Sequence, residues 1–377
     1  MRYIFWVCLA VALYTYFGYP ALTLLVGRLS RRTVPQGPYE PTVSIITAAR
    51  NEAPRIGASL ENKLSLDYAP GKVQIIVVSD ASTDGTDDIA REVGRDRVLM
   101  LRQEPRRGKT AALNLAMEHA TGEVVVFADA NSMYAPDVLR MLVRNLRDPQ
   151  VGYVTGRLVY GGSGGTETGC TAYMRYENAL RRAETRLGSI IGVNGGIDAV
   201  RRSLYMPMRD DQLPDFALPL DVVRQGYRVV YEPDAILKED SLTSSSAEYR
   251  MRVRVALRAW WTLMEMRALF NIRRYGFFSV QLFSHKALRY LAFIVFPLLY
   301  VSACALASSG PLYRTAFVAG SLFLMLACAG YVVERLGRSS RLVSLPYYFV
   351  VINAATGHAL FNFMRGRRQA VWTPRLG

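Results

Sequence analysis

Three long apolar stretches divide the chain, and a fourth is less uniform. Residues 4–27 carry no charge over about the 20 residues that a helix needs to cross a bilayer, and 290–308 and 315–333 each suit one such helix. The fourth stretch, 344–364, contains three polar side chains that a lipid-facing helix disfavours. These side chains are Asn353, His358 and Asn362. The pattern predicts a membrane anchor near the beginning of the chain and a membrane region near its end.

The middle of the chain alternates between two other patterns. Short apolar, β-branched runs predict strands, and longer amphipathic runs between them predict helices. The predicted strands are 42–49, 73–80, 97–103 and 123–130, and the predicted helices are 55–66, 86–94 and 109–121. Strands that alternate with helices form βαβ units, so we expect an α/β fold with a mostly parallel sheet. Ligands bind at the carboxyl ends of such strands, where Asp80 and Asp129 stand.

Three basic residues follow the first apolar stretch closely. Arg28, Arg31 and Arg32 follow it directly, so the positive-inside rule places its beginning outside and the α/β segment in the cytoplasm. A cleaved signal peptide is the alternative. The length of the stretch and the lack of a clear small-x-small cleavage site favour a retained anchor.

The later stretches predict a hairpin that leaves the cytoplasm and returns to it. Lys286 and Arg289 precede 290–308, and Glu334 and several arginines follow 315–333. For 344–364 two interpretations stay open. If it spans the membrane, the arginines after it lie outside, against the charge rule. If it is re-entrant or interfacial, they stay inside. These arginines are Arg365, Arg367 and Arg368.

The position of the net charge along the chain supports the membrane interpretation. The formal net charge is +15, and residues 249–377 contain 17 Lys and Arg against Glu265 and Glu334, so the excess lies entirely in this part of the chain. Positive charge placed among apolar segments is typical of contact with the cytoplasmic leaflet. We therefore expect no nucleic-acid partner.

Other classes of protein are disfavoured by what the sequence lacks. The cysteines (Cys8, Cys170, Cys304 and Cys328) show no short-spaced pairing, so a disulfide scaffold is not expected. Only His119, His285 and His358 are available as nitrogen ligands, and no CxxC occurs, which argues against zinc. Neither GxxxxGK[ST] nor a GxGxxG after a strand is present, which weakens an ATPase or nicotinamide interpretation.

One short segment suggests a hard cation. Asp129-Ala130-Asn131 places a carboxylate and an amide oxygen at a strand end. Mg²⁺ or Mn²⁺ binds through one or two such ligands and completes its shell with phosphate oxygens and water. A turn or helix cap is the structural alternative for an isolated Asp at this position.

Seven segments in order over residues 40–295 give the sequence a family resemblance. They are SIITAARNE (44–52), VVSDASTDGT (77–86), RRGKTAALNLA (106–116), VVFADANS (125–132), GVNGGIDAVRR (192–202), LPDFALPLDVVRQGYRVVYEPDA (213–235) and FSHKALRYL (283–291). Together they resemble the membrane-bound family 2 glycosyltransferases, the group of cellulose, chitin and hyaluronan synthases and bacterial exopolysaccharide enzymes. The resemblance implies a GT-A catalytic domain and transfer of a sugar from a nucleotide donor.

The resemblance assigns the donor site residue by residue. Asn51 and Glu52 match a pair that borders the nucleotide, although they also suit the start of a helix. Asp80 matches the acid that contacts a uracil ring, and the nearby Asp84 is expected to cap a turn. Lys109 matches a residue near the diphosphate, with a solvated surface lysine as the alternative.

The resemblance also assigns the reaction centre. Asp129 matches the first Asp of the DxD motif that holds Mn²⁺ or Mg²⁺, and Asn131 stands where many members have a second Asp. Asp215 matches the catalytic base, which takes a proton from the acceptor hydroxyl. The acid that commonly precedes this base is replaced by Pro214. A helix N-cap is the structural alternative for Asp215.

The acceptor side departs further from the family. Gly195 and Gly196 match a loop beside the acceptor, with a tight turn as the alternative. Residues 248–270 predict an interfacial helix with arginines at lipid headgroups. Processive members have Gln-x-x-Arg-Trp there, and this chain has Met251, Arg254 and Val255, so only Arg254 remains to hold a diphosphate. Trp260 and Trp261 are expected to anchor in lipid, or to replace the missing tryptophan at the acceptor.

These expectations combine into one domain organisation. We expect an anchor at 1–34, a GT-A domain at 35–245, amphipathic interfacial helices at 246–287 and a membrane region at 288–377. The predicted activity is inverting, metal-dependent transfer from a UDP-sugar to a lipid-linked or membrane-associated glycan, on the cytoplasmic side of a bacterial inner membrane and alongside polysaccharide-assembly proteins. The alternatives are a processive β-glycan synthase that exports its product and an inactive scaffold with the same fold.

Overall fold

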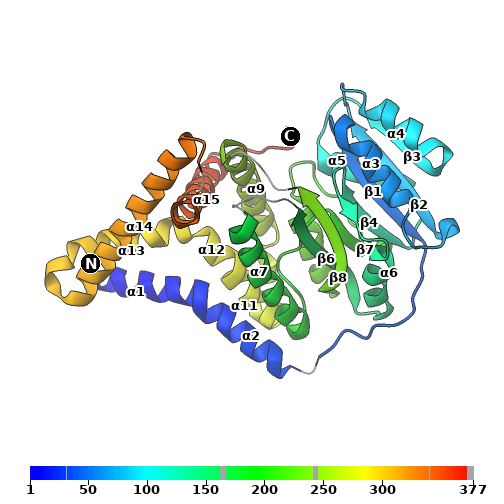
Figure 1. Ribbon diagram of the computed structural model, residues 1–377. Coiled ribbons are helices and arrows are strands. Elements are labelled where there is room, and N and C mark those ends of the chain that lie inside the picture. Colours follow the sequence, from blue (N-terminus) through cyan, green and yellow to red (C-terminus); the bar gives the residue numbers. More distant parts are fainter. Residues whose placement is uncertain (31, 162–166, 241–244, 339, 372–377) are drawn as a thin grey trace.

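A mixed sheet of eight strands organises the protein (Figure 1). The computed structural model describes residues 1–30, 32–161, 167–240, 245–338 and 340–371. The strand order is β3-β2-β1-β4-β7-β6-β8-β5. The strands are β1 (Val43–Ala49), β2 (Val73–Asp80), β3 (Val98–Gln103), β4 (Val124–Asp129), β5 (Met133–Tyr134), β6 (Val151–Gly161), β7 (Ile197–Arg201) and β8 (Arg228–Asp240).

Helices cover this sheet and continue into an elongated helical region at the left of Figure 1. Those of the first half are α1 (Arg2–Leu13), η1 (Tyr14–Gly18), α2 (Tyr19–Leu29), α3 (Ala53–Leu64), η2 (Pro70–Lys72), α4 (Thr86–Gly94), η3 (Arg95–Arg97), α5 (Lys109–His119), α6 (Val138–Val143), η4 (Arg144–Arg147) and α7 (Glu167–Leu187). Those of the second half are η5 (Arg202–Leu204), α8 (Pro214–Arg224), α9 (Ser245–Glu265), η6 (Arg267–Phe270), α10 (Ile272–Tyr275), α11 (Phe277–Leu282), η7 (Phe283–Ala287), α12 (Leu288–Tyr290), α13 (Ala292–Ala305), η8 (Ala307–Ser309), α14 (Pro311–Arg335) and α15 (Arg341–Met364).

The first half of the sheet is parallel and buried on both faces. Strand β1 pairs in parallel with both β2 and β4, and each of its residues is buried. Side chains alternate between faces along a strand. Ile45 therefore packs with α3 and α6 on one face, whereas Ile46 packs with α5 and α8 on the other. Continuous apolar runs such as VSIITAA are typical of strands covered on both sides.

The second half of the sheet reverses direction. Strand β7 lies antiparallel between β4 and β6, and β6 pairs in parallel with β8. This arrangement brings the loop before β7 next to the carboxyl end of β4. The α/β class predicted from the sequence is confirmed, with parallel pairing concentrated in the first four strands.

The elements predicted before β5 agree closely with the structure. Helix α4 has the predicted bounds, and strand β2 begins and ends at the predicted residues. Helix α3 begins and ends two residues before its predicted bounds, at Ala53 and Leu64, and α5 ends at His119.

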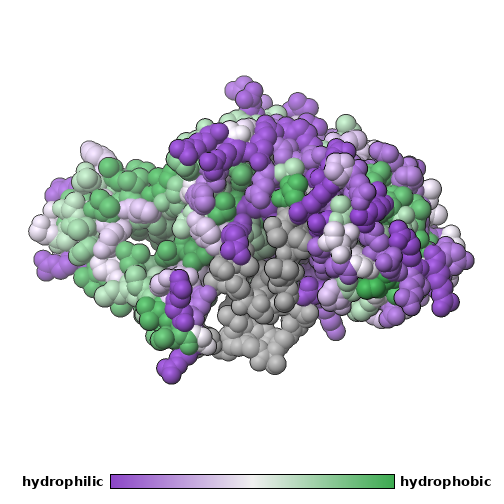
Figure 2. Space-filling view, turned by 90° about the horizontal axis from the view of Figure 1, so that it is seen from above, coloured by the Kyte–Doolittle hydropathy of each residue, from purple (hydrophilic) through white to green (hydrophobic). Residues whose placement is uncertain are grey.

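Two helices in the described part of the chain are long and apolar enough to cross a membrane. They are Arg2–Leu29, which combines α1, η1 and α2, and Pro311–Arg335, which is α14. Large apolar side chains on these helices are exposed, and Figure 2 shows hydrophobic surface gathered over the helical region and hydrophilic surface over most of the α/β domain. An apolar surface of this extent fits contact with lipid.

The predicted span 290–308 needs correction. Helix α13 has 14 residues, which corresponds to about 21 Å and is shorter than the hydrocarbon core of a bilayer. It begins after a bend of 62° that separates it from Phe277–Tyr290. The two pieces reach the length of a span only when they are counted together.

The expected position of the 248–270 helix at lipid headgroups is wrong for its central residues. Ala259 and Leu263 of α9 join the core of the α/β domain, and Leu257 packs against Ala359 of α15. Arg258 is 4% exposed and donates to the backbone oxygen of Gln369 at 2.8 Å. The amphipathic pattern was correct, but protein rather than lipid covers the apolar faces.

The contacts of the segment after α15 separate the two interpretations of 344–364. Arg368 donates to Asp211 at 2.6 Å, and the carbonyl of Ala370 lies against Gly108. The chain after α15 therefore returns to the α/β domain. This contact excludes the arrangement in which Arg365 and its neighbours lie across a membrane from that domain.

Candidate active site

The predicted site residues gather at the carboxyl ends of the parallel strands. Asn51 follows β1, and Asp80 and Asp129 end β2 and β4. Lys109 begins α5, and Asp215 lies in the first turn of α8. The topology therefore brings together residues that are up to 164 positions apart in the sequence, as the α/β pattern predicted.

Asp80 holds the loop that leads into α5. Its carboxylate is fully buried and accepts from Gln103 at 2.5 Å and from the N–H groups of Arg107 and Gly108 at 2.9 and 3.2 Å. Gly108 has φ +101, and a Cβ there would lie 2.5 Å from the carbonyl oxygen of Ala370. This position therefore requires glycine. The contact of Asp80 with a nucleobase stays a prediction, because its oxygens already bind groups of this chain.

The Asn51-Glu52 turn is locked to the loop after β2. Asn51 has φ +51, and its side-chain oxygen accepts from the N–H of Thr83 at 2.9 Å. Glu52 occupies the N-cap position of α3, but its side chain does not cap that helix. Asp84 accepts from the N–H of Ala53 at 3.0 Å, which confirms its predicted structural role. The role of Asn51 and Glu52 towards a nucleotide stays a prediction.

Lys109 and Asp129 form an ion pair at the centre of the site. The ammonium donates to Oδ1 of Asp129 at 2.6 Å, and both side chains are half-buried. Burial disfavours the charged lysine, but Asp129, Asp215 and Asp198 more than offset this effect, so the pKa of Lys109 stands above its usual value. The lysine is therefore cationic at neutral pH and faces three carboxylates.

A turn of two glycines brings Asp129 and Asp215 close to one stretch of backbone. Gly195 and Gly196 have φ +71 and +66, a conformation that other residues rarely adopt. A Cβ on Gly195 would lie 2.9 Å from Oδ2 of Asp215, and a Cβ on Gly196 would lie 3.3 Å from Oδ2 of Asp129. The tight-turn interpretation is correct, and it places the turn between the two acids.

Asp215 differs from its acidic neighbours in how it is partnered. Asp210 pairs with Arg107 at 3.1 Å, and Asp211 pairs with Arg209 at 3.0 Å and with Arg368. Arg209 and Arg368 hold the pKa of Asp211 below its ordinary value despite partial burial.

The pKa of Asp215 moves in the opposite direction. Burial raises it, the charge of Asp129 adds to this rise, and Lys109 and Arg258 only partly oppose it. Of these three acids, Asp215 is the one with the character of a base.

Two further acids lie near the site and were not predicted from the sequence. Asp198 on β7 is 1% exposed, and burial and the charge of Asp215 raise its pKa to about 7. Glu239 at the end of β8 accepts from the hydroxyl of Ser132 at 3.2 Å. An acid inside the apolar strand IDAVR was a usable signal for Asp198. No local pattern pointed to Glu239.

Lys63 supports the Asp129 turn from beneath. Its ammonium donates to the carbonyl of Ser132 and to the hydroxyl of Ser59, both at 2.8 Å. Burial lowers the pKa of Lys63 to about 7, although Asp129 and Glu239 oppose the shift. Lys63 lies on the apolar face of α3, one turn after Ser59 and two turns after Ile56, which was an available sequence signal. It fixes the backbone that follows Asp129.

Replacing Lys63 with methionine should weaken metal-dependent nucleotide binding. The substitution keeps the apolar stem but removes the donor to Ser132, so the turn that carries Asp129 loses its support. Losing an outer-shell partner typically costs about 10–100-fold in metal affinity, and we expect a loss in that range. Titration of Mn²⁺ followed by electron paramagnetic resonance would measure it. Lys72→Met, at a half-exposed lysine of η2 that donates to the carbonyl of Glu40, is the matched control, and equal affinities in the two variants would contradict a positioning role.

The tryptophans and arginines of α9 contact the end of the chain. Trp261 donates to the backbone oxygen of Arg367 at 2.9 Å, and Arg368 stacks on its ring at 4.0 Å. Trp260 packs against Tyr290. The expected lipid anchoring of Trp260 and Trp261 is therefore replaced by packing within the protein, and their acceptor role stays a prediction. Arg254 lies close enough to Arg258 to lower its pKa, and its contact with a diphosphate is also untested.

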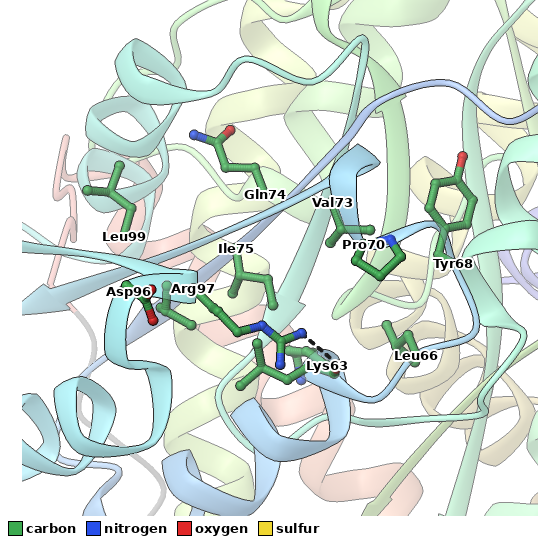
Figure 3. A pocket seen from close by; sticks show the side chains of 12 residues that line it. Lys63, Leu66, Tyr68, Pro70, Val73, Gln74, Ile75, Asp96, Arg97 and Leu99 are labelled. Carbon is green, nitrogen blue, oxygen red and sulfur yellow. Dashed lines mark hydrogen bonds between the residues drawn. The ribbon is translucent and has the colours of Figure 1, made fainter.

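A separate hollow of about 510 Å³ lies at the opposite ends of the strands (Figure 3). Val73 and Val98, the first residues of β2 and β3, line it together with Leu66 and the stem of Lys63. Arg97 crosses it to donate to the carbonyl of Leu64 at 3.2 Å. Its position separates it from the acids at the carboxyl ends.

The donor set fits a divalent cation that phosphate oxygens help to bind. Among the described residues, no group of three or more His, Cys, Asp or Glu side chains could enclose a metal ion. Asp129 and the half-buried Asn131 offer one carboxylate and one amide oxygen on a fixed turn. Mg²⁺ and Mn²⁺ accept such a partial set when phosphates and water complete the shell.

Comparison with known proteins agrees with this architecture. Residues 44–206 match the family model described as Glycosyl transferase family 2. An N-acetylglucosaminyltransferase of Mesorhizobium japonicum is 30% identical over 223 residues, which cover 54% of this chain and 52% of that protein. A poly-beta-1,6-N-acetyl-D-glucosamine synthase of Staphylococcus aureus is 27% identical over 203 residues, which cover 52% and 48%. The chain spans about half the length of these curated relatives.

A solved structure matches almost the whole chain. It is the mannosyltransferase PcManGT from Pyrobaculum calidifontis, in complex with GDP-Man and Mn²⁺. The TM-score is 0.73 at 24% identity, over 97% of this chain and 99% of that chain. This likeness establishes the GT-A fold. The family model matches residues 44–206, so the resemblance to family 2 glycosyltransferases seen in the sequence is confirmed for that part of the chain.

Proposed function

We propose that the protein transfers a sugar from a UDP-sugar to a hydroxyl of a lipid-linked or membrane-associated glycan, with inversion of the anomeric carbon. The observation that carries this proposal is the Gly195-Gly196 turn, which lies against Asp215 on one side and Asp129 on the other. An acceptor held near this turn would lie beside the base Asp215, and the donor-binding acid Asp129 would lie at the other end of the turn. The names of the curated relatives favour N-acetylglucosamine as the sugar.

In this proposal Asp215 takes the proton from the acceptor hydroxyl as its oxygen attacks the anomeric carbon. Attack opposite the leaving group inverts that carbon. Lys109 is held cationic and supplies positive charge where the leaving diphosphate gains negative charge. Mn²⁺ or Mg²⁺, held by Asp129 with Asn131 as a second donor, would neutralise more of that charge. The Mn²⁺ in the structural neighbour supports this choice of ion.

The pH dependence of transfer should show an acid limb above the ordinary Asp range. Burial raises the pKa of Asp215, and a base must be deprotonated, so kcat/KM should fall as the pH drops through that raised value. Arg258→Met should move the limb to still higher pH, because the Arg258 cation lowers the pKa of Asp215.

A pH–rate profile of each variant would measure this shift. Asp198 also titrates near neutral pH, so Asp198→Asn is the control. If the limb disappears in Asp198→Asn, it does not belong to Asp215.

A processive synthase is the second candidate, because one relative is named as a polymer synthase. Against it, Met251 and Val255 stand where processive members have Gln and Trp. An inactive scaffold is the third candidate. It gains no support from a site in which Lys109, Asp129 and Asp215 are brought together.

The experiment uses the full-length protein in detergent with bacterial lipid extract, Mn²⁺ and a panel of UDP-sugars. GDP-mannose is included because the structural neighbour binds it. One sugar added to an extractable lipid would support single transfer. A polymer ladder would establish the processive candidate, and no metal-dependent release of nucleotide would establish the scaffold.

We also propose that the protein resides in a bacterial inner membrane with the α/β domain in the cytoplasm. The two candidate spans and the arginines after Leu29 support this orientation. In the cytoplasm the domain would have access to nucleotide sugars and would contribute to polysaccharide synthesis with its assembly proteins.

A further inference from the structure

A buried cluster of charges lies where the N-terminal helix meets the α/β domain. Glu177, Arg181 and Glu184 project from α7, and His285 and Lys286 belong to η7. Helix α2 contributes Tyr19, whose hydroxyl donates to Glu184 at 2.6 Å, and Figure 1 shows α2, α7 and α11 running close together. The proposed reaction uses none of these residues.

Both carboxylates of the cluster are fully engaged. Glu184 accepts from Tyr19, from Nδ1 of His285 at 2.7 Å and from the N–H of Ile191 at 3.1 Å. Glu177 pairs with Arg289 at 2.7 Å and with Nε2 of His285 at 3.3 Å. Burial opposes ionisation, but these partners hold the pKa of Glu177 and of Glu184 below the ordinary value. The two negative charges are therefore permanent and already paired.

Two cations of the cluster have no carboxylate within ion-pair distance among the described residues, although the charges of Glu177 and Glu184 act on Lys286 from farther away and partly oppose the burial that lowers its pKa to about 8. Arg181 is 7% exposed and donates to the carbonyl of Gly192 at 2.9 Å and to the amide oxygen of Asn178 at 2.7 Å. The ammonium of Lys286 lies 5.3 Å from the centre of the Phe216 ring. It also lies 3.4 Å from where a Cβ on Gly192 would stand. Buried or half-buried charges are costly without a counter-ion, so this pair indicates a site for an anion.

The position of this pair suits the acceptor rather than the donor. Gly192 lies three residues before Gly195, which contacts Asp215, and three residues span at most about 11 Å. Phe216, over which Lys286 lies, directly follows Asp215. The donor groups Asp129 and Lys109 lie beyond Gly196, at the other end of the same loop. An anion at Lys286 would thus lie near the base and next to η7 and α12.

We propose that Lys286 and Arg181 bind the phosphate of a lipid carrier that presents the acceptor sugar to Asp215. The inference rests on the proposed transferase function and adds the acceptor class, a sugar linked through phosphate to a long-chain lipid. The shared chemistry is a phosphate anion. The position beside α2 and α12, close to the candidate spans, favours a lipid as its source.

The test measures binding of a long-chain polyprenyl phosphate and of the matching polyprenol to the full chain in phosphatidylcholine nanodiscs. Native mass spectrometry would count the bound lipid. A hydrogen bond to a charged group contributes about 1.5–3 kcal/mol, so the wild-type protein should retain the phosphate at least about tenfold better than the alcohol. Lys286→Met should lose this preference, and Lys286→Arg should keep most of it. Arg273→Met, an exposed cation of α10, is the matched control and should keep it fully.

Several outcomes would overturn the proposal. Equal retention of polyprenyl phosphate by wild type and Lys286→Met would show that Lys286 does not bind it. If inorganic phosphate or phosphatidylglycerol competed as strongly as the carrier itself, the lipid part of the carrier would not be recognised. A weaker affinity for UDP with unchanged lipid binding would assign Lys286 to the donor. Lys286→Gln gives the same comparison if the methionine variant does not fold. If the wild-type protein prefers the phosphate over the alcohol but shows no metal-dependent release of nucleotide, the transferase function is refuted and the phosphate site is not.

Discussion

Asp215→Asn should lower kcat by about 10³-fold, within the range that a positioned general base contributes. The amide has the shape of the carboxylate but cannot take the acceptor proton. Asp215 lies against the backbone of Gly195, which needs no change to accept the amide, so the fold should be retained. Affinity for UDP with Mn²⁺ should change little, because Asp129 and Lys109 remain. Product formation and nucleotide binding, measured on the same preparation, would separate the two effects.

Asp210→Asn and Asp211→Asn are the matched controls for this result. Both acids precede Asp215 closely and both are engaged by arginines. If either control abolished transfer while Asp215→Asn remained active, the base would be placed incorrectly. A large loss of UDP affinity in Asp215→Asn would also contradict the assignment.

Asp129→Asn should abolish measurable Mn²⁺-dependent binding of UDP. It removes the carboxylate proposed to hold the ion and leaves Lys109 without the partner at 2.6 Å that stabilises its charge. The loss should exceed the range of about 10–100-fold expected for an outer-shell partner such as Lys63. Calorimetric titration of UDP with and without Mn²⁺ would measure it.

Asn131→Ala provides the comparison for this prediction. If the amide oxygen is a ligand, affinity for Mn²⁺ should fall, but by less than in Asp129→Asn because no charge is lost. Unchanged Mn²⁺ affinity in Asp129→Asn would refute the proposed metal site. If Mn²⁺ affinity falls in Asp129→Asn but is unchanged in Asn131→Ala, then Asp129 is a ligand and Asn131 is not.

The part of the fold that the sequence predicted well is the part governed by local pattern. Strand β2 and helix α4 have the predicted bounds, because a continuous apolar run and an amphipathic run each specify one element. Asp80 and Asp129 were placed correctly because the carboxyl ends of parallel strands share one edge of a sheet.

The parts that the sequence did not predict depend on distant contacts. Lys63 and Ser132 are 69 positions apart, and Arg258 reaches Gln369 across 111 positions. Periodicity identified the apolar faces of α9 but could not distinguish lipid from protein as the covering partner. The bend before α13 likewise interrupts a run that is apolar throughout.

The packing of α9 to α11 has a consequence for how the protein is made. Leu263, Leu269 and Leu282 complete the core that begins with Ile46 and Ile76. Domains generally fold from the N-terminal end as the ribosome delivers them. Here one face of the sheet is covered only in part, by α5 and α8, until the ribosome has delivered residue 282, while the first candidate span is already available for insertion. A nascent chain of this protein is therefore expected to need chaperone protection during that interval. For the same reason, a fragment that ends at residue 245 should aggregate when it is expressed alone.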